Sequence, residues 1–191
     1  MAGRAGQDQD PTEVMDALLG RTDGKQYLVF RMGAEEYGIG IPWIQEIRRW
    51  EEPNPMPATP EYVRGILNLR GGAVPVMDLR IKLESGEAVY SDRTVLLVVH
   101  SPGGEDAALA VDAVSEVLAI PGEAVRPVSR LSESRDSRFL EGVAVLEERM
   151  VLLVDMDELL EGQEDGMMTG FRQAVEEAPA AGMNGEEAGN G

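Results

Sequence analysis

EYVRGILNLRGGAVPVMDLRIKL, at residues 61–83, is repeated in register and without a gap by RFLEGVAVLEERMVLLVDMDELL at residues 138–160. The two segments lie at a constant offset of 77 residues, and most apolar positions between the identities hold other apolar residues. Such exchanges preserve a packing arrangement, because a buried site tolerates changes that keep volume and polarity. The identical pairs are Gly65/Gly142, Leu69/Leu146, Val74/Val151, Asp78/Asp155 and Leu83/Leu160.

A second match lies upstream at an offset of 70 residues, between residues 39–47 (IGIPWIQEI) and 109–117 (LAVDAVSEV). A repeat of this length usually marks a repeated structural unit. Because only two copies occur, the sequence predicts paired subdomains and not a solenoid. The copies differ sharply where NLRGG at 68–72 is replaced by VLEER at 145–149. Residues that the shared packing does not explain are the first candidates for function.

The composition limits the function classes. Among 191 residues there is one histidine and no cysteine, and the formal net charge is −18. A nucleic-acid binder needs a basic surface, so this charge argues against one. No apolar run approaches the roughly 18–20 residues that span a bilayer, and residues 1–10 hold no hydrophobic segment of the secretory kind. We therefore expect a cytoplasmic protein with no direct membrane insertion.

Both ends of the chain are poor in apolar residues. Residues 1–24 are rich in Gly, Asp and Gln, and residues 161–191 in Gly, Glu and Ala. Such segments bury too little apolar surface to offset chain entropy, so we expect a flexible N-terminal segment and an acidic, flexible C-terminal tail. Helical spacing in the tail nevertheless allows one short docking helix, formed by Met167, Met168, Phe171 and Val175.

Between these ends the periodicity is mostly that of strands. Four hairpins are expected, at 27–41, 66–77, 94–111 and 143–154, each with aromatic or β-branched runs around a turn. Short helices are expected at 59–62, where a cap residue precedes proline, and at 78–83 and 155–160, which begin with an acid. Many short strands between frequent turns indicate small barrels or sandwiches. The prediction is two small barrels that share a hydrophobic seam.

The residues available for catalysis are few. His100 lies at the end of an apolar run, and a structural role is expected for it. No Gly-x-Ser-x-Gly elbow and no phosphate-binding loop occur, so the common hydrolase and nucleotide motifs are absent. We predict no enzymatic activity, no metal and no cofactor.

The clearest candidate for function is the segment Asn68-Leu69-Arg70-Gly71. Arg70 is expected at a hairpin tip, either in solvent or paired with Glu46 beside Ile44 and Ile47 in a charge-assisted contact that holds an apolar groove. Gly71 and Gly72 permit positive φ at the turn. Pro75 lacks a ladder donor and indicates an edge strand or bulge, and an open edge is a docking surface.

With these segments in view, the chain resembles the chemotaxis coupling protein family CheW. The resemblance covers residues 25–160 and rests on YLVFRMGAEEYGIGIPWIQEIRRW, PMPATPEYVRGILNLRGGAVPVMDLRIKL, LAVDAVSEVLAIPGEAVRP and FLEGVAVLEERMVLLVDMDELL. It implies a mainly β fold of two five-stranded, SH3-like barrels packed on a shared hydrophobic seam, with few short helices and the chain crossing between the barrels. No receiver domain or kinase core accompanies the match, so the chain is similar to the stand-alone coupling protein.

The resemblance also implies two partners, namely the cytoplasmic tip of chemoreceptors and the regulatory domain of the histidine kinase CheA. Carried over by position, the receptor groove includes Ile44, Glu46, Ile47, Val117 and Leu118, with Arg70 in support. The CheA contact involves Gly65, Leu67, Gly71 and Val74, and a ring contact involves Arg126 and Leu131. The sequence departs from the family pattern at Arg49, Gly72 and Leu131.

The expected role is thus a non-catalytic adaptor at membrane-associated receptor arrays. Two alternatives remain open at this stage. One is a CheW-like adaptor of a non-flagellar chemosensory pathway, such as twitching motility. The other is a small-molecule-binding β-barrel that uses Trp43, Trp50 and the apolar seam.

Overall fold

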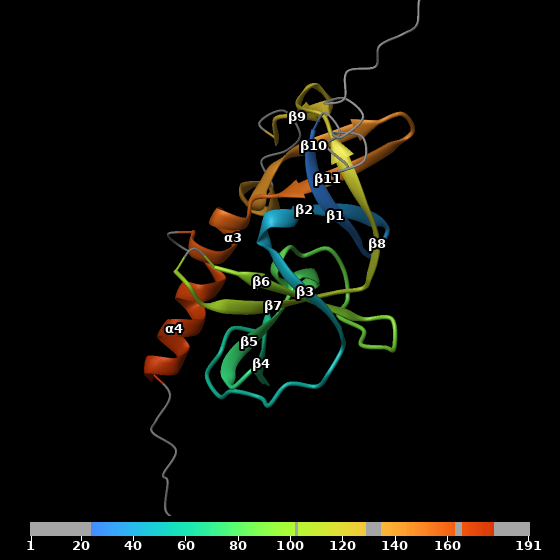
Figure 1. The fold of residues 1–191 in the computed structure, drawn as a ribbon. Coiled ribbons are helices and arrows are strands. Elements are labelled where there is room, and N and C mark those ends of the chain that lie inside the picture. Colours follow the sequence, from blue (N-terminus) through green and yellow to red (C-terminus); the bar gives the residue numbers. More distant parts are fainter. Residues whose placement is uncertain (1–23, 102, 129–134, 163–165, 178–191) are drawn as a thin grey trace, which may run out of the picture.

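The computed structural model describes residues 24–101, 103–128, 135–162 and 166–177. Its strands form two sheets, which we call barrel 1 and barrel 2 (Figure 1). Barrel 1 has the order β3-β6-β7-β5-β4, built from β3 (Ile44–Arg49), β4 (Val63–Leu69), β5 (Gly72–Asp78), β6 (Val95–His100) and β7 (Asp106–Val111). Barrel 2 has the order β8-β1-β2-β11-β10-β9, built from β1 (Lys25–Met32), β2 (Glu35–Gly40), β8 (Ala113–Ile120), β9 (Val125–Arg126), β10 (Leu140–Leu146) and β11 (Arg149–Val154).

The strand registers repeat between the barrels with the offsets of the sequence. The parallel pair β5–β7 aligns Val76 with Ala108, and the parallel pair β11–β2 aligns Leu153 with Gly38. A register shift between Val63 and Gly65 likewise recurs in β10 between Leu140 and Gly142. The duplication read from the sequence is therefore a duplication of the strand pairing itself.

The barrels are not the two halves of the chain. Barrel 2 takes its first hairpin, β1–β2, from the start of the described chain and its second, β10–β11, from near the end, whereas barrel 1 lies between them in sequence. All four expected hairpins form. The sequence comparison did not identify which hairpins share a barrel.

Three apolar clusters fill the fold. One lies inside barrel 1 and includes Leu67, Val74 and Val98, and one lies inside barrel 2 and includes Val29 and Leu153. The third and largest cluster takes residues from both barrels and from the C-terminal helices, among them Phe30, Met77, Leu97, Leu109 and Leu159. This third cluster is the shared hydrophobic seam that the sequence predicts, and it confirms the two-barrel architecture.

Two short helices begin at the duplicated acids. The side chain of Asp78 accepts from the backbone N–H of Arg80 at the start of α2 (Leu79–Lys82), at 2.9 Å. Asp155 accepts from the N–H of Glu158 at 3.1 Å at the start of α3 (Met156–Glu161). Single turns of 3₁₀ helix are η1 (Ile41–Trp43), η2 (Gly122–Ala124) and the slightly longer η4 (Arg135–Phe139).

The helix expected at 59–62 is wrong, because these residues form turns. The Thr59 hydroxyl donates to the carbonyl of Met56 at 3.2 Å, where a cap would accept from the backbone. The carbonyl of Pro60 accepts from the N–H of Val63, at 2.9 Å, so the chain turns directly into β4.

The C-terminal segment contains a helix, α4 (Met167–Glu177), which lies against barrel 1 (Figure 1). Met167 and Met168 are buried in the seam cluster, and Phe171 packs against it. The expectation of a flexible tail is wrong for these residues, because the two methionines supply the apolar surface that a docked helix needs. Val175 is 46% exposed and does not belong to the docking face. The segment 1–23 lies outside the described residues.

Strands β3 and β8 were not expected from the sequence. Each is the edge strand of its barrel and has one neighbour. Their side chains are mostly half-buried or exposed, and neither sequence alternates apolar with polar residues along its whole length, so the period-two signal of a strand is weak there. Among the helices of the described residues, none combines the length and the apolar character needed to cross a membrane.

Candidate partner-binding groove

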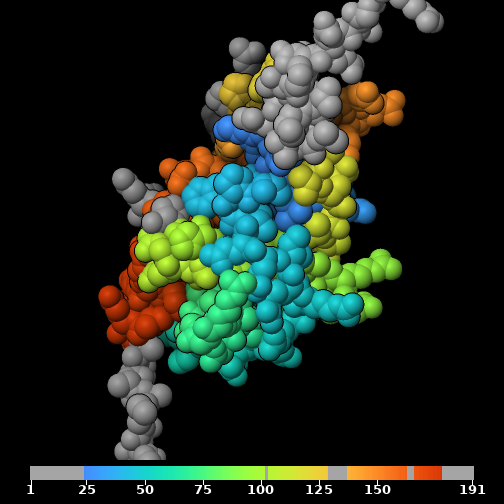
Figure 2. All heavy atoms as spheres, viewed as in Figure 1, coloured from blue at the N-terminus to red at the C-terminus, as the bar shows by residue number. Residues whose placement is uncertain are grey.

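The equivalent edge strands β3 and β8 lie on the same face of the molecule (Figures 1 and 2). Each displays one exposed aliphatic side chain: Ile47 of β3 is 49% exposed and Val117 of β8 is 51% exposed. Ile44 and Leu118 are half-buried and pack against the seam and the interior of barrel 2, respectively. Unpaired strand edges beside exposed aliphatic side chains favour the docking of another chain.

Arg70 and Glu46 form the predicted ion pair. The Nη2 atom of Arg70 donates to Oε2 of Glu46 at 2.7 Å, and Nη1 of Arg48 lies 3.3 Å from Oε1 of the same carboxylate. Arg70 has a φ of 53° and Gly71 a φ of 81°, whereas Gly72 is not in the left-handed region. Positive φ at both central residues is typical of a type I′ hairpin turn, so the turn places Arg70 beside β3.

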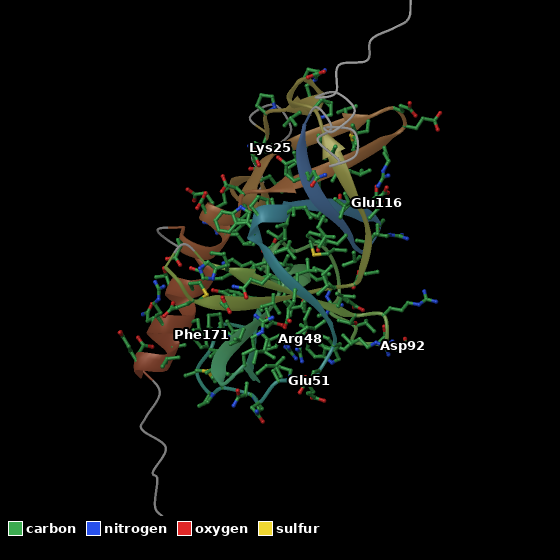
Figure 3. All side chains as sticks on the ribbon, in the orientation of Figure 1. Lys25, Arg48, Glu51, Asp92, Glu116 and Phe171 are labelled. Atoms are coloured by element: carbon green, nitrogen blue, oxygen red, sulfur yellow. The ribbon has the colours of Figure 1, made fainter. Side chains whose placement is uncertain are left out.

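Barrel 2 has a matching brace that the sequence analysis missed. The side chain of Arg149 donates to Glu116 on β8 at 2.8 Å and to both oxygens of Glu36 at 2.9 and 3.0 Å. Hydrogen bonds to Glu116 and then Glu36 raise the pKa of Arg149. The sequence signal that could have indicated this brace is the alignment of Glu116 with Glu46 in the upstream repeat. Figure 3 labels Glu116 on β8 and Arg48 on β3.

The residues expected at the CheA contact lie on strands β4 and β5, but most of them are buried. Leu67 and Val74 are 3% and 4% exposed and point into barrel 1. Gly65 is also buried, and a Cβ there would overlap the carbonyl oxygen of Asn54, which pairs with Ile66 across the edge of β4. Only Gly71 is exposed. Three of the four residues therefore support the packing at this end of barrel 1, and Gly71 alone among them lies on its surface.

Pro75 was expected on an edge strand or bulge. It lies in β5, which is an interior strand of barrel 1. The pairing of β5 with β7 begins one residue later, at Val76. At Pro75 the strand therefore has a paired neighbour on the β4 side alone, which accommodates a residue that has no N–H to donate.

Of the two residues expected at the ring contact, the structure describes Arg126 only. Arg126 lies on β9 opposite Val143, and its Nη1 donates to the carbonyl of Glu123 at 2.6 Å. Leu131 lies outside the described residues. The short strand β9 gives barrel 2 a sixth strand, in place of the five expected, and corresponds to the bridge between Asn54 and Ile66 in barrel 1.

A buried polar network joins the barrels and has no counterpart in the second copy. The Arg80 side chain is 1% exposed and donates to both oxygens of Asp78 at 2.9 and 2.6 Å. It also donates to Asp112 at 2.8 Å, and Asp112 accepts from the N–H of Gly33 in the β1–β2 turn of barrel 2 at 2.7 Å. Burial alone would lower the pKa of Arg80, but the hydrogen bonds that Arg80 donates to Asp78 and Asp112 outweigh it and raise the pKa. This network fixes barrel 1 to barrel 2.

The two tryptophans do not share a site. Trp43 lines a cavity of about 650 Å³ together with Tyr27 and Glu141. Trp50 stacks on Tyr90 in barrel 1, with ring centroids 4.1 Å apart. The small-molecule alternative, which uses Trp43, Trp50 and the apolar seam, stays a prediction, and the two rings would have to act in separate places.

His100 and the neighbouring Ser101 have separate partners. The buried Ser101 hydroxyl donates to Glu161 at 2.8 Å, while Nδ1 of His100 lies 2.9 Å from Asp106 and 3.0 Å from Gln45. His100 is directly opposite Asp106 in the β6–β7 ladder, which gives it a structural contact. Within the part of the chain that the structure describes, no group of three or more His, Asp or Glu residues is arranged to hold a metal ion.

These features define a duplicated-barrel module with a braced, exposed edge on each barrel, the kind of surface that binds other proteins. The family model described as "CheW-like domain" matches residues 26–164. The chain belongs to this family.

Individual relatives agree with the family match. The chain is 38% identical over 147 residues to chemotaxis protein CheW of Klebsiella aerogenes, covering 77% of this chain and 88% of the relative. It is 33% identical over 141 residues to chemotaxis protein CheW of Rhizobium meliloti, covering 74% and 90%. Among solved structures, scaffolding protein TtCheW from Thermoanaerobacter tengcongensis matches with a TM-score of 0.67 and 32% identity, covering 74% of this chain and 97% of that chain.

Proposed function

We propose that this protein is a non-catalytic adaptor that couples chemoreceptors to the histidine kinase CheA at the cytoplasmic face of receptor arrays. The observation that carries the proposal is the pair of braced edges, β3 held by Arg70–Glu46 and β8 held by Arg149–Glu116. Strand edges whose charged side chains are held in this way lose little conformational freedom on binding, which favours a docking role.

The receptor tip would occupy the groove formed by Ile44, Glu46, Ile47, Val117 and Leu118. Burial of Ile47 and Val117 would supply the apolar contact, and Arg70 would hold Glu46 in place. The regulatory domain of CheA would contact the end of barrel 1 around Gly65, Leu67, Gly71 and Val74. A second ring contact would use Arg126 and Leu131. The family match supports these partners, and the exposed edges support the groove.

Substitution of Ile47 by Asp tests the groove. It places a charge in an interface that would be desolvated on binding, so we expect receptor-fragment affinity to fall at least tenfold, or about 1.4 kcal/mol. Arg70→Ala should also weaken binding. Val89→Asp is the matched control, because Val89 is 66% exposed and lies outside the groove. Calorimetric titration with a receptor fragment measures all three, and wild-type affinity in both Ile47→Asp and Arg70→Ala would contradict the groove assignment.

A second candidate is the same adaptor role in another chemosensory pathway. The chain is 31% identical over 103 residues to Protein FrzA of Myxococcus xanthus, covering 54% of this chain and 64% of the relative, so the similarity extends to a protein whose name does not mention chemotaxis. Titration with each CheA-type kinase of the same genome distinguishes the two candidates, because the adaptor should prefer the kinase of its own pathway.

A further inference from the structure

An exposed apolar pair lies on the hairpin β10–β11 of barrel 2. Val145 is 44% exposed and Met150 is 63% exposed, and the two residues are directly opposite in the ladder. Side chains of such a pair stand next to each other on one face of the sheet. The inward face of the same hairpin carries Ala144, Leu146 and Val151, which pack inside barrel 2. Val145 and Met150 therefore face away from the interior.

The internal repeat shows that the fold does not require apolar residues here. The equivalent pair in barrel 1 is Asn68 opposite Ala73, in the same register and also exposed. Barrel 1 thus forms the same hairpin with a polar and a small residue at these positions. An exposed valine and methionine at the same place in barrel 2 have no packing reason, which points to contact with another molecule.

The surface beside this pair is hollow and acidic. Met150 and Leu152 line a cavity of about 420 Å³ with Ala34 and the charged residues Arg31, Glu35, Glu36 and Arg149. Glu147 and Glu148 form the exposed tip of the hairpin. These are two basic and four acidic residues, so the net charge is −2. The hairpin projects beyond the rest of barrel 2 (Figure 1), and Val145 and Met150 on it are both exposed.

We propose that the outward face of β10–β11 is a docking surface for a protein segment with apolar side chains flanked by Lys or Arg. The apolar residues would cover Val145 and Met150 and enter the hollow, and the basic residues would pair with Glu147, Glu148 and Glu35. A second copy of this chain is a poor occupant, because a formal net charge of −18 makes two copies repel.

The test is fluorescence polarisation of the full-length protein with a fluorescein-labelled peptide of two leucines and a phenylalanine between arginines. We expect saturable binding that weakens with added salt. The double substitution Val145→Asn/Met150→Ala should lower the affinity at least tenfold without lowering the melting temperature, since it installs residues of the kind that barrel 1 holds at the equivalent positions. Replacing the peptide arginines by glutamates should have a similar effect.

Two controls separate this surface from others. Ile47→Asp should bind the peptide as the wild type does, because Ile47 lies on the edge strand β3 of barrel 1 and not on the hairpin β10–β11. Val175→Asn removes an exposed valine of α4 and should also have no effect. The proposal is overturned if the wild type shows no saturable binding, or if the double variant retains wild-type affinity.

Discussion

Single residues show where the duplicated packing imposes a side chain and where it leaves one free. Gly65 has a φ of 137° and lies directly beneath the backbone of Asn54, whereas Gly71 has a φ of 81° and no atom within 4 Å of an added Cβ. Both are glycines of one hairpin and both belong to the predicted CheA contact. Only at Gly65 does the fold itself exclude a side chain.

Gly65→Ala should therefore destabilise the protein strongly. The left-handed backbone costs about 1–3 kcal/mol for a non-glycine residue, and the clash with Asn54 adds to it. Gly71→Asn should cost less, because asparagine tolerates this conformation and the space is open. Urea denaturation measures both, and equal losses of unfolding free energy would be inconsistent with this difference. An aspartate at this position would meet the same clash. A loss of CheA binding in Gly65→Asp would therefore be explained by misfolding and would not identify Gly65 as a contact residue.

At this scale the sequence predicted the Arg70–Glu46 pair but missed Arg149–Glu116. The first prediction succeeded because a hairpin tip with a cation faced an acid beside apolar residues. The second brace uses an arginine that aligns with Gly72, not with Arg70, so the comparison of equivalent positions conceals it. Exposure is also invisible in the sequence, which is why Leu67 and Val74 were expected at a surface although they are buried.

At the scale of single elements, helices α2 and α3 begin at the duplicated acids Asp78 and Asp155, which differ in how many contacts they make. Asp155 caps α3 from a partly exposed position, whereas Asp78 caps α2 and also neutralises the buried Arg80. The sequence predicted both helix starts from the acid. It could not predict the network, because Asp112 and Tyr90 meet Arg80 only after the chain has folded.

Asp78→Ala and Asp155→Ala separate these two roles. Loss of the Asp155 cap should cost about 1 kcal/mol. Loss of Asp78 leaves a buried guanidinium without one of its partners and should cost roughly 3–5 kcal/mol. Chemical denaturation of the two variants provides the comparison, and a loss for Asp78→Ala as small as that for Asp155→Ala would mean that the network contributes little.

Tyr90 joins the same network, because its hydroxyl donates to Oδ2 of Asp78 at 2.7 Å, and this contact predicts a pH dependence. Burial and then the hydrogen bond to Asp78 raise the pKa of Tyr90 to about 12, from about 10 in the unfolded chain. A raised pKa in the folded state contributes stability that is present below pH 10 and is lost as the pH rises to 12. The stability difference between wild type and Tyr90→Phe should shrink over this range in thermal melts. A constant difference from pH 9 to 12 would exclude the effect.

The edge strands β3 and β8 show why sequence patterns are least informative at a binding surface. Neither strand alternates apolar and polar residues, the pattern on which strand prediction depends: β3 holds Ile44 and Ile47 three residues apart, and β8 holds Val117 and Leu118 in succession. The upstream repeat aligned Glu46 with Glu116 and so contained the equivalence. The groove was therefore predicted through the family resemblance, while the strands that form it were not.

The whole molecule is held together by the seam, which includes residues of both barrels and of α4. The duplication predicted paired subdomains, and the many short strands between frequent turns predicted that these are two small barrels sharing a seam. Which hairpins share a barrel was not predictable, because pairing between distant strands has no local signal. The docking of α4 was suggested by helical spacing, although Ala174 and not Val175 completes its buried face.

Met168→Ala tests the docking of α4. Met168 is 1% exposed, and truncating a buried methionine usually costs about 2–5 kcal/mol. Val175→Ala on the exposed side of the same helix should stay within about 0.5 kcal/mol. Differential scanning calorimetry should show a lower melting temperature for Met168→Ala alone. Identical melting temperatures for the two variants would place α4 off the body of the protein.

The adaptor role is tested most directly by titrating the full-length protein into the purified regulatory domain of CheA from the same genome, by calorimetry at two salt concentrations. An adaptor predicts saturable binding near one to one with a dissociation constant in the micromolar range or below. Absence of binding at both salt concentrations, with the protein folded by circular dichroism, would contradict the coupling role.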